Sequence, residues 1–146
     1  MKIPYSHIIE SISCRPSIED LSKSLLHLGH EHEIENNIFD LELTPNRGDC
    51  LSLKGILRDL SAFYNIKSDL NIYDKDIDEL KINFHNDIEI ACPKISFLEV
   101  EIDNKILNYK EYLNRYFKDL NINKNNFFTD ISNYLSYETG QPTHCY

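Results

Sequence analysis

The chain has 146 residues, of which 41% are hydrophobic, four are glycine and five are proline. This length and composition support a buried core in one domain or two small ones and exclude a disordered chain. The 24 acidic residues outnumber the 15 basic ones, for a net charge of −9, so the sequence predicts neither a phosphate-binding face nor a stand-alone nucleic-acid binder.

The first seventy residues begin with the pattern of an amphipathic helix. Ser17 is placed to cap this helix, and Asp20 stands at the capping-box position. The apolar stripe runs to Leu28, and Gly29 follows as the residue that ends the helix.

A β-hairpin and a second helix are expected next. Residues 30–34 and 38–43 alternate in the manner of strands, and Asn36-Asn37 predicts the tight turn between them. Apolar residues at helical spacing then predict a helix over residues 49–64.

The acidic stretch 73–79 is expected to be a linker, because charged residues there interrupt the hydrophobic pattern. Three short strands are predicted after it, over residues 80–84, 88–91 and 97–102.

Two further helices are predicted over residues 109–120 and 127–137, the second ended by Gly140. The pattern therefore predicts an α+β fold. A helix–strand domain would occupy residues 1–72, and a mixed α/β domain would occupy residues 80–146.

Cysteine spacing and the short apolar runs indicate in which cellular compartment the protein is expected. The four cysteines are dispersed and form no C-x-x-C pair, so we expect free thiols in a reducing cytoplasm rather than a zinc site. No apolar run is long enough to cross a bilayer, and no basic leader opens the chain, so neither membrane contact nor export is expected.

Three histidines near the first helix end, His27, His30 and His32, raise the possibility of a metal site. If residues 30–34 form a strand, His30 and His32 share one face, while Glu31 and Glu33 point to the other. With no matching ligand group elsewhere, packing is favoured over metal binding, and no metal is expected.

The first chemically informative motif is a turn that leads into the second helix. It consists of Pro45, Asn46, Arg47, Gly48 and Asp49. Asp49 is suited to cap the helix, whereas turn geometry does not require Arg47, which could clamp a carboxylate or a subunit contact. A structural turn is favoured over an interaction site.

The second motif spans the last predicted helix and the loop after it, and it ends on His144. Its other members are Asp130, Asn133, Tyr134, Gly140 and Pro142. A loop histidine held after a helix end can recognise a hydroxyl or position a water molecule. The alternative is a histidine satisfied by the adjacent helix end.

The two motifs, in this order and joined by Cys92-Pro93-Lys94, resemble the N-terminal part of the β subunit of bacterial phenylalanyl-tRNA synthetase. The resemblance implies that residues 80–146 open an editing domain, whose pocket hydrolyses tyrosine wrongly attached to tRNA(Phe) and includes His144. Such a second site selects for the hydroxyl that the synthetic pocket excludes poorly. The resemblance to the synthetase also implies that ATP and magnesium serve the whole synthetase, with no cofactor in this segment.

Three departures from that family stand out. The family's Gly-Ile-Arg step is Asn121-Ile122-Asn123 here, so Asn123 supplies no guanidinium to the pocket, although Lys124 is adjacent. The inserted OB-fold tRNA-binding domain is missing, and the family's sequence continues for several hundred residues past Tyr146.

The resemblance implies a partner α subunit in an α₂β₂ assembly, with tRNA(Phe) bound through other parts of the complex. The expected role is architecture and part of proofreading within a phenylalanine–tRNA ligase, with little activity from this segment by itself. Two alternatives stay open: a structural module whose editing has decayed, and a free-standing deacylase that edits in trans.

Overall fold

The computed structural model describes residues 1–67, 79–101 and 108–146. The chain divides into two compact units: the first comprises residues 1–67 together with 108–146, and the second contains residues 79–101. The linker predicted at 73–79 lies almost wholly outside the described residues, so the predicted domain division stays a prediction.

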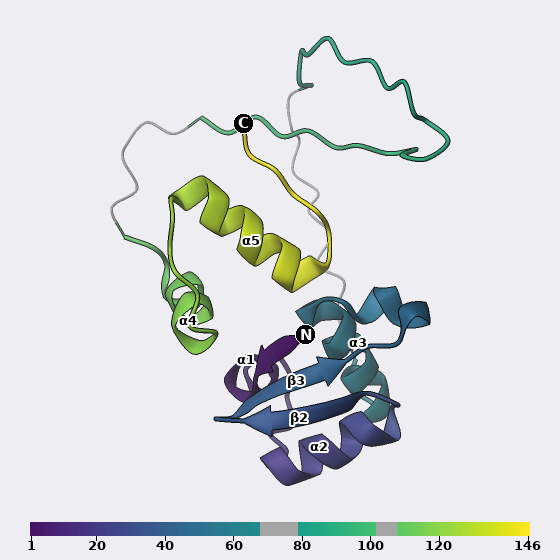
Figure 1. Cartoon of the computed structure of the whole chain (residues 1–146), viewed down its shortest axis with the longest axis vertical. Helices are drawn as coiled ribbons and strands as arrows, with labels where there is room; N and C mark the ends of the chain where they lie inside the picture. The colour runs from purple at the N-terminus through teal and green to yellow at the C-terminus, as the bar shows by residue number, and fades with distance from the viewer. Residues whose placement is uncertain (68–78, 102–107) are drawn as a thin grey trace. The chain divides into compact units, whose positions relative to one another are not determined.

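A three-stranded antiparallel sheet organises the first unit (Figure 1). Its strands are β1 (Lys2–Pro4), β2 (Glu31–Glu35) and β3 (Ile38–Glu42), in the order β1-β3-β2. The predicted hairpin is confirmed: Asn36 and Asn37 have φ of 51° and 63°, as a two-residue turn with two left-handed positions requires. The sequence does not predict β1, because three residues are too few to show alternation.

Two short-range signals at the first long helix act as the sequence predicts. In α2 (Ile18–His27) the Ser17 hydroxyl accepts a hydrogen bond from the Asp20 amide at 3.1 Å. Gly29 follows with φ of 84°, the left-handed conformation that glycine adopts at low cost. A further short helix, α1 (Tyr5–Ile9), is not predicted by the sequence.

The prediction that the next helix begins at Asp49 is wrong. Residues Pro45–Cys50 form a 3₁₀ helix, η1, and the α-helix α3 (Leu53–Phe63) begins after it. Ser52 is the cap, since its hydroxyl accepts from the Gly55 amide at 3.0 Å. A Cβ at Gly55 would lie 2.2 Å from the Asp49 carbonyl oxygen, so only glycine allows η1 and α3 to approach this closely.

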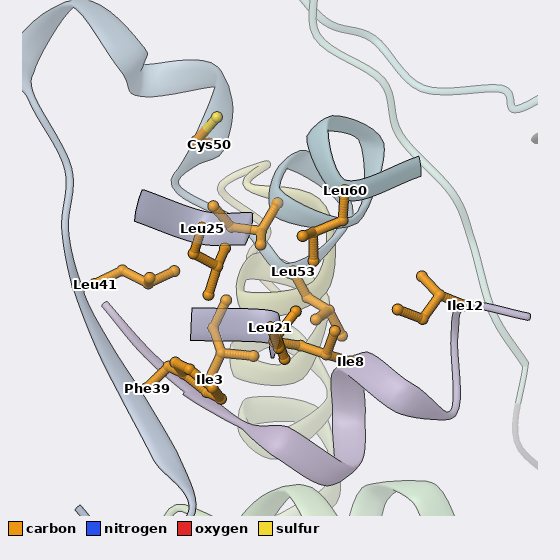
Figure 2. Close-up of a cluster of buried hydrophobic side chains, with 11 residues drawn as sticks. Ile3, Ile8, Ile12, Leu21, Leu25, Phe39, Leu41, Cys50, Leu53 and Leu60 are labelled. Carbon is orange, nitrogen blue, oxygen red and sulfur yellow. The ribbon is translucent and has the colours of Figure 1, made fainter. Parts of the chain in front are cut away.

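The main core lies between the apolar face of the sheet and the helices α1, α2 and α3. Figure 2 shows its side chains converging from all of these elements. The buried members are Ile3, Ile8, Ile12, Leu21, Leu25, Phe39, Leu41, Cys50, Leu53, Ile56 and Leu60. Each fully buried aliphatic or aromatic side chain of this kind contributes about 1.5–3 kcal/mol to folding.

The two predicted C-terminal helices are confirmed as α4 (Glu111–Asp119) and α5 (Phe127–Thr139). They bury a second cluster centred on Leu113, Tyr116 and Phe117. Tyr137 packs against both clusters. The two helices therefore share hydrophobic surface with the N-terminal elements.

The strands predicted over 80–84, 88–91 and 97–102 are wrong as far as the structure describes them, which excludes residue 102. Residues 79–101 contain no strand, only a turn at 87–91. A strand is stable only when a neighbour satisfies its backbone groups, and the described part of this unit offers none. Large apolar side chains are consequently exposed: Ile82, Phe84, Ile88, Ile90, Ile95, Phe97, Leu98 and Val100.

Among the residues that the structure describes, no helix has both the length and the apolar character needed to cross a membrane.

Candidate functional site

The two sequence motifs meet in the first unit. The end of α5 lies against the start of α3, where a Cβ at Gly140 would be 3.2 Å from Cβ of Ser52. Lys54 and Glu138 face each other across the same contact, with 3.8 Å between Nζ and Oε1. The turn at residues 45–50 and the loop at 141–146 are therefore two ends of one packed region.

Arg47 is the centre of an ion-pair network within the first motif. Its Nε donates to Asp49 Oδ1 at 3.1 Å, and its Nη2 pairs with Asp59 on α3. Arg58 pairs with the same two carboxylates and lies 3.1 Å from Asp59 Oδ1. Arg47 thus clamps carboxylates of its own chain, which supports the structural interpretation of this turn.

The carboxylates of the network are held in their charged forms. The hydrogen bond from Arg47 is the main cause that lowers the pKa of Asp49. Burial by itself would raise the pKa of Asp59, but hydrogen bonds from Arg47, Arg58 and His30 together outweigh it and lower the pKa. Both guanidinium groups have raised pKa values, chiefly through these hydrogen bonds.

His30 and Cys50 complete the network. The sequence suggests His30 only as a possible metal ligand and does not single out Cys50. His30 is 2% exposed, and its Nε2 lies 3.1 Å from Asp59 Oδ2. Burial, followed by the charge of Asp59, raises the pKa of the Cys50 thiol to about 11. One sequence signal could have indicated this network: Asp59, ten residues after Asp49, follows Arg58 on the helix that comes directly after the motif. A carboxylate at that position can reach the arginine of the motif.

His30, Cys50 and Asp59 also bring potential metal-ligand atoms within 4.8 Å of one another. The guanidinium of Arg47 lies among them, with Nη2 2.7 Å from Cys50 Sγ. The positive charge that a metal ion would bring is already supplied there by two arginines, and the thiol is held neutral. The arrangement is that of a charge-neutralised structural cluster.

The three histidines that suggested a metal site do not converge. The ring of His32 bonds to the Ser22 hydroxyl at 2.8 Å and to the His30 carbonyl at 2.9 Å. His27 is exposed and lies edge-on to Phe63.

Asp130 in the second motif has a structural role. It is fully buried, and its Oδ2 accepts from the Tyr109 hydroxyl at 2.6 Å while Oδ1 accepts from the Asn125 amide at 3.0 Å. The hydrogen bond to Asp130 raises the pKa of Tyr109 to about 12. This carboxylate fixes the entry of α5 against the segment before α4.

Tyr134 is a packing residue of the aromatic cluster. Its ring lies between those of Tyr112 and Tyr116, with centroids 5.3 and 5.4 Å away. Burial raises the pKa of Tyr134 to about 12. Gly140 caps α5 with φ of 74°, as predicted.

His144 lies on the loop after α5 and lines a groove of about 320 Å³. The side chains around it are mostly hydroxyl or amide groups: Thr129, Ser132, Asn133, Ser136 and Thr143, with Pro142 and Cys145. The groove therefore presents hydrogen-bonding groups beside an exposed imidazole, and it contains Asn133, Pro142 and His144 of the predicted site residues.

Asn123 and Lys124 are not among the residues that line this groove. Asn123 is exposed, and the Lys124 ammonium group lies 2.5 Å from Asn114 Oδ1 and 4.9 Å from the Tyr109 ring centre. Lys124 thus contacts α4 through Asn114 and the segment before α4 through Tyr109. Asn121, which stands at the glycine position of the family's Gly-Ile-Arg step, adopts φ of 52° after α4, a left-handed conformation that asparagine tolerates better than most residues.

Comparison with known proteins gives a consistent result. No family model matches the chain, and no solved structure matches it. The chain is similar to the phenylalanine–tRNA ligase β subunits of Rickettsia bellii (32% identical over 120 residues), Rickettsia typhi (34% over 120) and Nitrosospira multiformis (30% over 142). These matches cover 77%, 77% and 88% of this chain.

The relatives are thus subunits of an aminoacyl-tRNA ligase. The chain is homologous to a segment of the phenylalanine–tRNA ligase β subunit, and the resemblance found from the two motifs is confirmed. It spans only 13%, 14% and 18% of the length of these three relatives.

Proposed function

We propose that this chain serves as part of a phenylalanine–tRNA ligase β subunit and contributes to hydrolytic proofreading of tRNA(Phe). Its homology to β subunits supports the first part of the proposal. The observation that carries the second part is the exposed imidazole of His144 in a groove lined with hydroxyl groups. The substrate would be tyrosine esterified to tRNA(Phe).

The groove has the chemical character that selection for tyrosine requires. A synthetic pocket built for phenylalanine rejects an added hydroxyl only weakly, so a second site must recognise that hydroxyl. Thr129, Ser132, Asn133 and Ser136 recur along one face of α5, and their side chains can donate to or accept from a phenol.

Hydrolysis at this site would break the ester bond between tyrosine and the terminal ribose. A water molecule attacks the ester carbonyl, and its oxygen ends in the tyrosine carboxylate. The ribose oxygen leaves and takes up a proton. The imidazole of His144 would orient the water and accept its proton at neutral pH.

The acidic chain leaves the tRNA backbone to other parts of the enzyme. With a net charge of −9, it would repel phosphates at long range. Its partner would be the synthetase α subunit, which would handle ATP and magnesium in an α₂β₂ assembly.

The test is release of tyrosine from tyrosyl-tRNA(Phe), measured with the chain alone and after mixing with the α subunit. We expect release only in the mixture, and loss of at least about 100-fold in rate with His144→Ala. His27→Ala is the matched control, because His27 is also exposed but lies on α2 away from the groove. Equal rates for His144→Ala and the unchanged chain would refute the proposal.

A second candidate function is a purely structural module of the β subunit. Asn123 favours it, since that exposed residue stands where the family has an arginine and does not line the groove. The absence of tyrosine release in every assay, together with stable binding of the α subunit, would establish this alternative. Release by the chain alone would instead identify a free-standing deacylase.

A further inference from the structure

Three residues attach the loop that carries His144 to α5, and Thr143 is the one that bonds through both its hydroxyl and its carbonyl group. The Gln141 amide donates to the Thr139 hydroxyl at 3.2 Å, and the Cys145 thiol donates to the Phe128 carbonyl oxygen at 3.5 Å. Of residues 141–146, Thr143 is half-buried and the others are exposed. The loop must nevertheless hold the imidazole in place, because a mobile group loses the rate advantage that positioning provides.

Thr143 and Ser132 hold each other by reciprocal hydrogen bonds. The Thr143 hydroxyl donates to the Ser132 carbonyl oxygen at 3.0 Å, and the Ser132 hydroxyl donates to the Thr143 carbonyl oxygen. The two hydroxyl oxygens are 3.0 Å apart. Each of the two residues therefore contributes its carbonyl oxygen and its hydroxyl group to this pair of hydrogen bonds.

The hydrogen bonds between Thr143 and Ser132 lie next to His144 and can therefore limit the direction of its side chain. Ser132 is in the second turn of α5, is 9% exposed and lines the groove. Fixing the backbone carbonyl of Thr143 limits rotation of the peptide that leads directly into His144. At the other end of the loop, Gly140 is fixed against Ser52, so the chain is held on both sides of Gln141 and Pro142.

We propose that Thr143 is a positioning residue, which holds the His144 imidazole at the groove through its paired contacts with Ser132. The inference rests on the proposed hydrolytic function, and it adds a residue that acts through His144 rather than on the substrate. Ser132 and Thr143 both line the groove, so the test has to separate positioning of His144 from direct contact with the substrate, and it does so through backbone order and through the split between kcat and KM.

The test compares Thr143→Val, which keeps the shape and removes the hydroxyl, with Thr143→Ser, which restores it. Thr44→Val is the matched control, since Thr44 is exposed and makes no side-chain cap hydrogen bond. Backbone order at residues 141–146 is measured by ¹⁵N relaxation on the full chain, and deacylation of tyrosyl-tRNA(Phe) is measured with the α subunit present.

We expect Thr143→Val to lower the order parameter of the His144 amide from about 0.85 to below about 0.6. We expect kcat to fall about tenfold, with KM changed less than about twofold, because the loss concerns geometry at the reacting atoms. Thr143→Ser is expected to recover both values, and Thr44→Val to change neither.

Unchanged order in Thr143→Val would overturn the inference, and so would lost order with unchanged kcat. A wild-type protein that releases no tyrosine would remove the proposed function and the positioning role with it. The order parameters would still show in that case whether Thr143 holds the loop, so the two failures can be told apart.

Discussion

The two motif turns both adjoin the contact between α3 and α5 but have opposite chemical characters. Around Arg47 every charge is paired within the chain, and Cys50 and His30 are buried beneath the pairs. Around His144 the loop is exposed, and the His144 side chain lines one side of the groove. The Arg47 guanidinium is bound to three side chains, those of Asp49, Cys50 and Asp59, and is poorly placed for chemistry. The exposed imidazole of His144 beside hydroxyl groups is available. The first turn therefore stabilises the fold, and the second is the candidate for function.

The largest expected effect is that of Asp59→Ala, which leaves Arg47 and the buried His30 without their shared carboxylate. We expect the free energy of unfolding to fall by about 2 kcal/mol, since removing the shared partner of a partly buried group of charges leaves uncompensated charge. Urea denaturation measures it. Asp87→Ala is the control, because that carboxylate is 86% exposed. A loss no larger than the control's would mean that the Arg47 turn is not a stabilising cluster.

The two turns each contain or adjoin a cysteine, and the thiols should differ in reactivity. Cys50 is buried, with its pKa raised to about 11, and Cys145 is exposed. At pH 8 we expect iodoacetamide to modify Cys145 at least about tenfold faster, because the exposed thiolate is the reactive species. Peptide mass spectrometry over time gives both rates. Equal rates would show that the first turn opens as freely as the second.

The contact between α1 and the C-terminal helices should depend on pH. His7 lies 2.9 Å from the Tyr137 hydroxyl and 3.4 Å from Asp119, with Glu10 and Arg115 nearby, and burial lowers its pKa despite the attraction of Asp119. The unfolded state binds the proton more readily than the folded state. The contribution of His7 to the free energy of unfolding is therefore fully present above about pH 6.5, the pKa in the unfolded state. This contribution is lost as the pH falls from there through the lower pKa of the folded state.

Urea denaturation between pH 5 and pH 8 checks this dependence. In His7→Gln we expect the slope of stability against pH over this interval to become smaller. In His27→Gln, where the ring is exposed on α2, the slope should remain. The hypothesis is wrong if His7→Gln retains the full slope.

The smallest expected effect on stability belongs to His144→Ala. Because His144 is exposed, the free energy of unfolding should change by less than about 0.5 kcal/mol. Thermal melting of the variant and the unchanged chain measures it. A large loss would show that this imidazole is a packing group, and the contrast between the two turns would disappear.

Short-range signals in the sequence predict the helix ends well. Ser17, Gly29, the Asn36-Asn37 turn and Gly140 all act as their residue types require, because capping and left-handed turns depend on a few neighbouring residues.

Errors arise where partners distant in the sequence decide the structure. The Asp49 carboxylate pairs with Arg47 and Arg58 and does not cap a helix, and the Ser52 hydroxyl caps α3 instead. The segment 79–101 has strand-like alternation but no described neighbour with which to pair. For the candidate site, the sequence proposes His144, which stays a prediction. No local pattern reveals the hydrogen bond of Thr143 to Ser132, which lies eleven residues earlier.

The strand order β1-β3-β2 also has a consequence for synthesis of the chain. Lys2–Pro4 is made before β2 and β3, and its partners in the sheet are residues 38–40. At about 5–20 residues per second on the ribosome, the first strand waits roughly two to seven seconds for its partner to be made. The hairpin of β2 and β3 closes within microseconds of its own completion. The N-terminal strand therefore joins the free edge of β3 after the hairpin has closed, because its pairing closes a much longer loop of chain.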